Sequence, residues 1–395
     1  MWTGTSFVLL SFILINCCSF SFSDRPLNFV QLGNKFGYDV EEIIVITEDG
    51  YILKLFHILN KKRFKTPVLL MHGVIDSSDT WIIRGNTSLA LTLAAKGYDV
   101  WAGNSRGNKY ARKHIYLDPN TNDDFWDFSF HESGFYDLPA IIDTVLHMTG
   151  EKKINAIGHS QGNTIFYVLG STRPEYNDKI NVLIALAPIC FLQNIPPPLS
   201  TIIKVSPELD KLAKTLNVVE ILGDKSLVVS FLRTFCPTPI VGYKVCILGL
   251  IFSTAGSDAE ELEPGYVRTF IDHFPVGTSV KDLIHFAQVS LRRKFANYDY
   301  GIEGNLQMYN LTEPPEYNLS AITMRVALLY GANDKLSTVE DVAILRGKLP
   351  NVIKYLLIPR KMMNHIDFIS GRNMEDYLFP YIFDTLNATD NNVNP

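Results

Sequence analysis

A single serine stands between two glycines in the segment Gly158-His159-Ser160-Gln161-Gly162. The segment follows an apolar run typical of a buried strand and precedes a run with helical spacing. This is the G-x-S-x-G pattern, in which a strained turn raises the serine hydroxyl above a sheet and beside a helix N-terminus. A plain tight turn would explain the glycines without any chemistry. The change from strand to helix at the serine favours a nucleophile.

A nucleophilic serine needs a base, an acid that orients the base, and donors for the charge that develops on the substrate oxygen. In the fold that carries this pattern, the partners follow the serine in the order acid, then histidine. His365 is the one histidine beyond the last predicted strand, and Asp334 stands at the end of the strand before it. Asp341 and Asp367 remain alternatives for the acid. The structural alternative makes Asp334 a helix N-cap and His365 a surface residue.

Two backbone N–H groups are predicted to form the oxyanion hole. One belongs to Gln161, directly after the serine. The other should come from the loop after an earlier strand, and His72-Gly73-Val74 occupies that place. We assign the N–H of Val74, whose side chain is not expected to take part.

Short apolar runs alternate with longer amphipathic stretches, which is the pattern of an α/β fold. The amphipathic stretches 89–97 and 137–150 have helical spacing. Fully apolar strands joined by helices predict a mostly parallel sheet with helices on both faces. The predicted strands are 51–58, 66–74, 98–107, 154–160, 180–188, 324–334 and 353–359.

Residues 191–308 interrupt this alternation. They begin with a proline-rich stretch, become helical, and contain two cysteines and an apolar run. We interpret them as an inserted, mainly helical cap over the carboxyl edge of the sheet, where open α/β sheets bind their ligands. The core would then consist of residues 24–190 and 309–395.

Residues 1–23 have an apolar centre followed by small residues, which predicts a secretory signal peptide. The alternative is a membrane anchor, although the apolar run is shorter than a span requires, and no later run is long enough. Four glycosylation sequons are also typical of a secreted protein, and they predict glycans at Asn86, Asn310, Asn318 and Asn387.

The cysteine pattern agrees with secretion. Cys236 and Cys246 are close in sequence, and a bond between them would close a short loop worth roughly 2–3 kcal/mol. Cys190 follows an apolar run and is expected to be a buried free thiol.

Composition excludes other classes. Hydrophobic residues make up 47% of the chain and charged residues 19%, which describes a globular protein. A net charge of −5 without a basic stripe argues against a nucleic-acid partner. The loop beginning at Asp118 starts like a calcium-binding loop, but Asp123 and Ser129 replace the required glycine and glutamate. No metal is predicted.

Together these features resemble the acid lipase family, the gastric and lysosomal lipases and their insect relatives. The resemblance runs nearly from end to end of the chain. It implies an α/β-hydrolase fold, no cofactor, catalytic roles for Ser160, Asp334 and His365, oxyanion donors at Val74 and Gln161, and a cap disulfide between Cys236 and Cys246. The segments that carry it are TEDGYILKLFHI (47–58), LLMHGVIDSSDTW (69–81), DVWAGNSRGNKYARKH (99–114), FWDFSFHESGFYDLPAIIDTVL (125–146), GHSQG, YGAND and NHIDF (364–368).

The resemblance implies a secreted or lysosomal lipase that hydrolyses neutral lipids, either triacylglycerols or sterol esters, at a lipid–water interface. Two alternatives remain: a carboxylesterase for smaller esters, and a lipid-binding or storage relative without turnover. Two departures from the family lie beside the predicted catalytic residues. Lys335 follows Asp334 where relatives often have an apolar residue, and Ile369-Ser370 replaces a commonly aromatic site.

Overall fold

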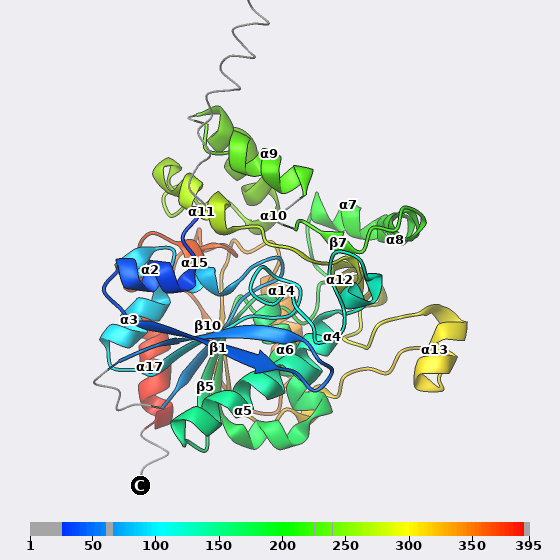
Figure 1. Cartoon of the computed structure of the whole chain (residues 1–395), viewed down its shortest axis with the longest axis horizontal. Helices are drawn as coiled ribbons and strands as arrows, with labels where there is room; N and C mark the ends of the chain where they lie inside the picture. Colours follow the sequence, from blue (N-terminus) through cyan, green and yellow to red (C-terminus); the bar gives the residue numbers. More distant parts are fainter. Residues whose placement is uncertain (1–25, 61–65, 224–225, 239, 391–395) are drawn as a thin grey trace, which may run out of the picture.

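An eight-stranded sheet lies at the centre of the molecule, with helices on both of its faces (Figure 1). The computed structural model describes residues 26–60, 66–223, 226–238 and 240–390, so the predicted signal peptide, 1–23, lies outside the described residues. The strand order is β1-β2-β4-β3-β5-β6-β9-β10. The pairs β1·β2 and β2·β4 are antiparallel, and all later neighbours are parallel. The predicted mostly parallel sheet is therefore confirmed.

All seven predicted strands are present in the central sheet, and one further strand of this sheet was missed. The missed strand, β1, pairs along the edge with β2 and has Val45 as its single buried residue, while Glu41 and Glu42 are exposed. Its apolar pattern is weak because an edge strand buries little of its surface. The strands are β1 Val40–Ile46, β2 Ile52–Ile58, β3 Val68–Met71, β4 Val100–Gly103, β5 Ile154–His159, β6 Ile180–Leu186, β9 Val326–Tyr330 and β10 Val352–Leu357.

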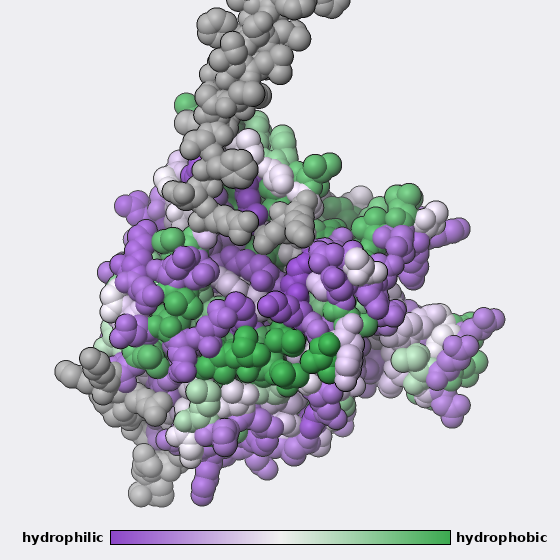
Figure 2. All heavy atoms as spheres, in the orientation of Figure 1, coloured by the Kyte–Doolittle hydropathy of each residue, from purple (hydrophilic) through white to green (hydrophobic). Residues whose placement is uncertain are grey.

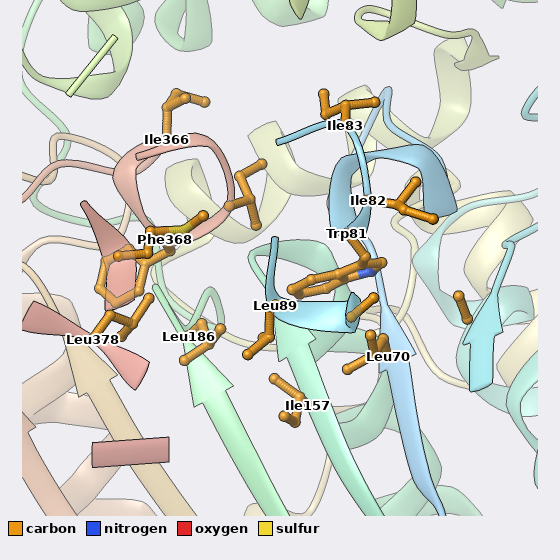
Figure 3. Packing of buried hydrophobic residues seen from close by; sticks show 14 of the residues in the cluster. Leu70, Trp81, Ile82, Ile83, Leu89, Ile157, Leu186, Ile366, Phe368 and Leu378 are labelled. Carbon is orange, nitrogen blue, oxygen red and sulfur yellow. The ribbon is translucent and has the colours of Figure 1, made fainter. Parts of the chain in front are cut away.

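Consecutive strand residues belong to two different apolar clusters, because side chains alternate between the faces of a sheet. Leu70 and Ile157 contribute to the cluster with α2, α3 and α17, whereas Leu69 and Ala156 contribute to the cluster with α5, α6 and α14. Figure 3 shows the first cluster, in which Trp81 lies close to Leu70. The sheet is thus buried on both faces, as its apolar strands require.

The helices outside residues 191–308 cover these two faces. Proline at the start of α5 and a left-handed Gly150 after its end agree with the helix predicted at 137–150. The helices are α2 Phe29–Lys35, α3 Leu89–Ala95, α4 Phe130–Glu132, α5 Leu138–Thr149, α6 Gln161–Thr172, α14 Val339–Lys348, α15 Asp367–Ser370, α16 Met374–Tyr377 and α17 Phe379–Asp390.

Residues 191–308 contain mainly helices. In Figure 1, α9, α10 and α11 lie above the sheet, and α13 projects to the side. A two-stranded ribbon, β7 Glu220–Ile221 with β8 Thr278–Ser279, and a π-helical segment, Tyr243–Ile251, complete this part. The helices are α7 Leu199–Lys204, α8 Ser206–Thr215, α9 Leu227–Phe235, α10 Phe252–Ala255, α11 Val267–His273, α12 Val280–Arg292 and α13 Gly301–Tyr309.

A disulfide joins Cys236, at the end of α9, to Cys246 in the π-helical segment. This is the pairing that the family resemblance implies. Cys190 is a buried free thiol among the described residues. None of the helices described here combines the length and apolar character needed to cross a membrane.

A buried arginine holds the loop that follows β4. The Arg106 guanidinium is 3% exposed and forms ion pairs with Asp49 (2.6 Å) and Asp137 (2.7 Å). Its flat face lies 3.9 Å from the centre of the Tyr51 ring. Because a fork-shaped cation is needed to bind both carboxylates, lysine could not replace it without loss. Arg106 thereby fixes the loop after β4, which borders the site.

Candidate active site

Ser160 occupies a strained turn between β5 and α6. Its φ of 55° and ψ of −120° lie outside the regions that side-chain-bearing residues normally adopt. The flanking glycines allow this conformation. A Cβ added at Gly162 would lie 2.2 Å from the carbonyl oxygen of Met71, and one at Gly158 would lie 2.4 Å from Asn163 Oδ1. The glycines are therefore required by close backbone packing, and the serine is held at the end of the strand.

His365 and Asp334 lie together at the same edge of the sheet. Nδ1 of His365 is 2.9 Å from Oδ2 and 3.1 Å from Oδ1 of Asp334. Asp334 Oδ1 also accepts hydrogen bonds from the N–H groups of Leu336 and Ser337, each at 2.8 Å. These two donors fix the carboxylate. The carboxylate in turn binds Nδ1 and orients the imidazole, so Nε2 remains available to accept a proton.

The other two candidate acids have different partners. Asp341 accepts hydrogen bonds from the backbone N–H groups of Gln193 (3.2 Å) and Asn194 (3.1 Å). Asp367 accepts one from the N–H of Asn364 at 3.0 Å. Both carboxylates thus organise loops, and of the three candidates Asp334 is the one hydrogen-bonded to the His365 ring.

The two proposed oxyanion donors come from two different segments that border the serine. Gln161 is the first residue of α6, so its N–H is one of those that the helix itself leaves without a partner. Val74 borders the same cavity as Ser160 and His365. Gly73 permits this approach, because a Cβ there would lie 3.2 Å from the Ser160 Cβ.

A neutral histidine supports the loop that carries Val74. His72 Nδ1 donates to the carbonyl oxygen of Gly73 at 2.7 Å, while Nε2 accepts from the N–H of Ser105 (3.1 Å) and from Asn108 (3.0 Å). Burial lowers the pKa of His72 to about 4, against a weaker opposing effect of its bond to Gly73. The imidazole therefore stays neutral in mildly acidic solution and keeps Nε2 as an acceptor.

Ser160 and His365 open onto an apolar cavity of about 400 Å³. Asp76 is the carboxyl group on its wall, and burial raises the pKa of Asp76 to about 8, so this carboxyl is neutral at pH 7. Both α9 and the π-helical segment contribute to the wall, as do loops of the sheet. The apolar lining residues include Leu222, Val228, Leu232, Leu250, Ile251, Ile271, Phe274, Leu336, Ile366 and Ile369.

Residues 252–257 attach directly to the loops that carry Asp334 and His365. The N–H of His365 donates to the carbonyl oxygen of Ala255 at 3.1 Å. Lys335 donates from Nζ to the carbonyl oxygens of Phe252 and Ser253, each at 3.3 Å. The unusual Lys335 therefore binds carbonyls of α10 and is not part of the apolar lining.

A second attachment joins residues 273–282 to the segment after β3, which carries the proposed donor Val74. The N–H of Val276 donates to the carbonyl oxygen of Ile75 at 2.8 Å. His273 Nδ1 lies 2.7 Å from a buried oxygen of Asp79. Sequence reasoning missed these contacts, because nothing local in the sequence signals pairs that are about 200 positions apart.

All four predicted glycosylation asparagines are exposed. Asn310 is the left-handed residue that ends α13, and Asn318 caps a short 3-10 turn. Asn387 lies within α17, where its side chain accepts a hydrogen bond from Tyr98 at 3.3 Å. In the described part of the chain, the His, Cys, Asp and Glu side chains form no group of three that could hold a metal ion.

The arrangement has the parts needed for acyl transfer: a serine on a strained elbow, a histidine oriented by a buried carboxylate, backbone donors beside the serine, and an apolar cavity. Hydrolysis of an ester with an apolar acyl group is the reaction that these parts suit.

Comparisons with known proteins point the same way. Residues 29–85 match the model of a partial α/β-hydrolase lipase region, and residues 66–217 match that of the α/β hydrolase fold. Lipase 1 of Drosophila melanogaster is 37% identical over 357 residues, which cover 90% of this chain and 79% of that protein. Gastric triacylglycerol lipase of Rattus norvegicus is 38% identical over 360 residues, 88% of each chain.

Among solved structures, a soluble variant of monoglyceride lipase from Saccharomyces cerevisiae has a similar fold. Its TM-score is 0.56 at 14% identity, with coverage of 90% of this chain and 98% of that one. At this identity the likeness concerns the fold alone.

Proposed function

The chain belongs to the acid lipase family of α/β-hydrolases, and from this premise we propose that it hydrolyses the ester bonds of neutral lipids, triacylglycerols or sterol esters. The observation that carries the proposal is the apolar cavity of about 400 Å³ onto which Ser160 and His365 open. A small soluble ester would not need so large an apolar wall, and a storage protein would not need the His365–Asp334 hydrogen bond at 2.9 Å.

In the proposed mechanism, Ser160 Oγ attacks the ester carbonyl carbon while His365 Nε2 takes the serine proton. Asp334 holds the proton on Nδ1 of His365 and stabilises the imidazolium. The carbonyl oxygen, now negative, accepts hydrogen bonds from the N–H groups of Gln161 and Val74. Collapse of this intermediate breaks the bond to the alcohol, which leaves with the proton from His365.

Water completes the cycle. His365 takes a proton from a water molecule, whose oxygen attacks the carbonyl carbon of the acyl-enzyme. The bond to Ser160 then breaks, the serine regains its proton from His365, and the fatty acid is released. No cofactor takes part in either half of the reaction.

We assign residues 191–308 as the cap and residues 24–190 and 309–395 as the hydrolase core. Support comes from the cavity wall, to which α9 and the π-helical segment of the cap contribute Val228, Leu232 and Leu250. These side chains would contact the acyl chain. The cap would also exclude water from the acyl-binding region, because it supplies part of the cavity wall.

The cap surface suits a lipid–water interface. Leu227 is 88% exposed and Phe231 59%, and both lie on α9 beside cavity-lining residues. Figure 2 shows apolar surface over α9 and over the region of α7 and α8. An exposed apolar surface next to a cavity mouth is typical of a contact with lipid or another partner.

The interface proposal is tested with Leu227→Asp/Phe231→Asp against a control on α13, Ile302→Asp, which also places a charge at an exposed apolar position (66%). The α9 variant should lose at least tenfold of its activity on emulsified triolein and keep its activity on a soluble short-chain ester. The control should keep both. Equal losses on the two substrates in the α9 variant would contradict interfacial binding by this surface.

We further propose that the protein passes through the secretory pathway to the extracellular space or the lysosome, with glycans at Asn86, Asn310, Asn318 and Asn387. The exposure of all four asparagines and the Cys236–Cys246 disulfide support this route. Digestion with an N-glycosidase, followed by mass measurement, would show which of the four carry glycans.

The substrate class is tested with a panel of p-nitrophenyl butyrate, triolein and cholesteryl oleate, using wild type and Ser160→Ala. Turnover of the long-chain lipids by wild type alone supports the lipase. Turnover of the short ester alone would favour a carboxylesterase. Binding of triolein without release of fatty acid would favour the storage alternative.

A further inference from the structure

Helix α12 of the cap directs one buried carboxylate at the catalytic elbow. The Nε2 amide of Gln161 donates to Oδ1 of Asp282 at 3.0 Å and to Oδ2 at 2.8 Å, across 121 positions of sequence. Asp282 is 1% exposed and Gln161 is 8% exposed. When Asp282 is ionised, this bond is stronger than an ordinary hydrogen bond because the site is buried.

The carboxylate is itself held in place by its neighbours. Thr278 Oγ1 donates to Asp282 Oδ2 at 3.1 Å, and the N–H of Asp282 donates to Ser279 Oγ at 3.0 Å. Ser279 Oγ in turn donates to the carbonyl oxygen of Phe128 in the core. Asp282 is therefore a fixed anchor and not a side chain free to follow Gln161.

We propose that Asp282 is a positioning residue of the oxyanion hole, which acts by holding the side chain of Gln161 so that the backbone N–H of the same residue points at the substrate oxygen. This inference rests on the proposed function, in which that N–H is a donor. Gln161 is the first residue of α6, where helical hydrogen bonds do not fix the N–H. The hydrogen bond from the Gln161 side chain to Asp282 would fix the orientation of this N–H instead.

The same cap stretch also reaches the other proposed donor. The N–H of Val276 donates to the carbonyl oxygen of Ile75, the residue after Val74, at 2.8 Å. Residues 276–282 thus contact both segments that carry the oxyanion donors. The role of this part of the cap would be to pre-organise the catalytic donors in addition to covering the acyl chain.

Charged groups surround Asp282 on several sides. Burial raises the pKa of Asp282 to about 7, the bonds from Gln161 and Thr278 and a backbone bond at Phe130 oppose this, and Glu132 adds to it. His72, Asp76 and Arg106 border the same small cavity. A pH–rate profile is therefore informative, because the acceptor strength of Asp282 changes near neutral pH.

The test compares Asp282→Ala, Asp282→Asn and Gln161→Met with wild type. Gln161→Met keeps the backbone N–H and removes only the side-chain amide that donates to Asp282. The matched control is Lys281→Met, the neighbouring residue of α12, whose ion pair with Asp127 at 2.7 Å does not involve the elbow.

Rates on p-nitrophenyl butyrate are divided by the number of active sites titrated with an organophosphonate. An alkylboronic acid, which forms a tetrahedral anion on Ser160, reports on the oxyanion hole.

Asp282→Ala and Gln161→Met should each lower kcat by roughly 10- to 100-fold, with KM changed less than about twofold and boronate affinity weakened in parallel with kcat. Asp282→Asn retains one acceptor oxygen and should recover most of the loss, with a flatter pH–rate profile near pH 7. Lys281→Met should behave as wild type. The double variant Gln161→Met/Asp282→Asn should be no worse than Gln161→Met alone.

A wild-type kcat per titrated site in Gln161→Met or Asp282→Ala would overturn the proposal, whatever happens to thermal stability. Failure of the proposed function is a separate outcome: it would appear as wild-type protein that the organophosphonate does not titrate.

Discussion

Nδ1 of His365 lies 2.9 Å from Oδ2 of Asp334, and the same carboxylate accepts two backbone N–H groups through Oδ1. An amide in place of this carboxylate would keep its oxygen toward the two backbone donors and turn its NH₂ toward His365. Nδ1 would then have to accept, which moves the ring proton to Nε2 and blocks removal of the Ser160 proton. We predict that Asp334→Asn lowers kcat roughly 10³- to 10⁴-fold without unfolding the protein.

Asp341→Asn is the matched control for this prediction. Asp341 is also buried, but it accepts from the backbone of Gln193 and Asn194. Its substitution should lower Tm and leave kcat per titrated active site within about threefold of wild type. A kcat loss in Asp341→Asn that matched the loss in Asp334→Asn would reassign the acid.

The glycines of the elbow should tolerate no side chain. In Gly162→Ala the new methyl carbon would lie 2.2 Å from the carbonyl oxygen of Met71, and backbone cannot yield as a side chain does. We expect a loss of at least about 3 kcal/mol in the free energy of unfolding, together with loss of activity. Denaturant unfolding and ester hydrolysis measure both.

Gly347→Ala provides the opposite case. Gly347 lies in α14 with open space around its Cα, so alanine should raise the unfolding free energy by about 0.5–1 kcal/mol. If Gly162→Ala were as stable and active as Gly347→Ala, the close packing of the elbow described above would be wrong.

Two buried carboxyls should make the protein less stable as the pH rises above neutrality. Burial raises the pKa of Asp76 to about 8 and that of Asp282 to about 7, from an ordinary value of 3.8. Between the ordinary value and the raised one, the folded state holds a proton that the unfolded chain has lost, so stability falls with increasing pH. Burial lowers the pKa of His72 to about 4 and that of His285 to about 3. Below pH 6.5 the unfolded chain binds protons that these folded histidines do not, so the two histidines make stability rise with increasing pH.

The two effects oppose each other below pH 6.5. Above it the raised carboxyls dominate, and Asp367, whose pKa burial also raises well above its ordinary value, acts in the same direction. The unfolding free energy should therefore fall by roughly 2–3 kcal/mol between pH 6.5 and pH 8. Asp76→Asn, which cannot ionise, should remove most of this decline, whereas a substitution at the exposed Asp178 should not. Unfolding curves at several pH values test this, and a wild-type stability that rose over the same interval would contradict it.

Sequence reasoning succeeded where the signal was local. The fully apolar strands β3, β5 and β6 were predicted because a parallel sheet buries both faces. The strand-to-helix change at Ser160 predicted the elbow in the same way. Edge strand β1 was missed because Ile44 and Ile46 are more than half exposed and their neighbours Glu41 and Glu42 are charged.

Contacts between distant segments could not be predicted. Asp282 is an ordinary acidic residue in the first turn of an amphipathic helix, and its sequence context indicates an N-terminal helix charge. Its bond to Gln161 depends on how the cap returns to the core. Lys335 is a similar case, since its carbonyl partners Phe252 and Ser253 lie more than 80 positions away.

The segment that we propose as the cap attaches to the site through two stretches, and this limits how it could move. Residues 252–257 bind the loops of Asp334 and His365. Residues 273–282 bind the two segments that carry Val74 and Gln161. Any opening of the cavity that moved either stretch would disturb the catalytic groups.

The central claim is that Ser160 is the nucleophile. The most direct measurement is covalent labelling with an alkyl organophosphonate, followed by mass spectrometry of the peptides and an activity assay on the same sample. We predict one label per molecule, attached to Ser160, with activity lost in proportion to labelling and no label in Ser160→Ala. Complete labelling of Ser160 with undiminished lipase activity, or full activity in Ser160→Ala, would contradict it.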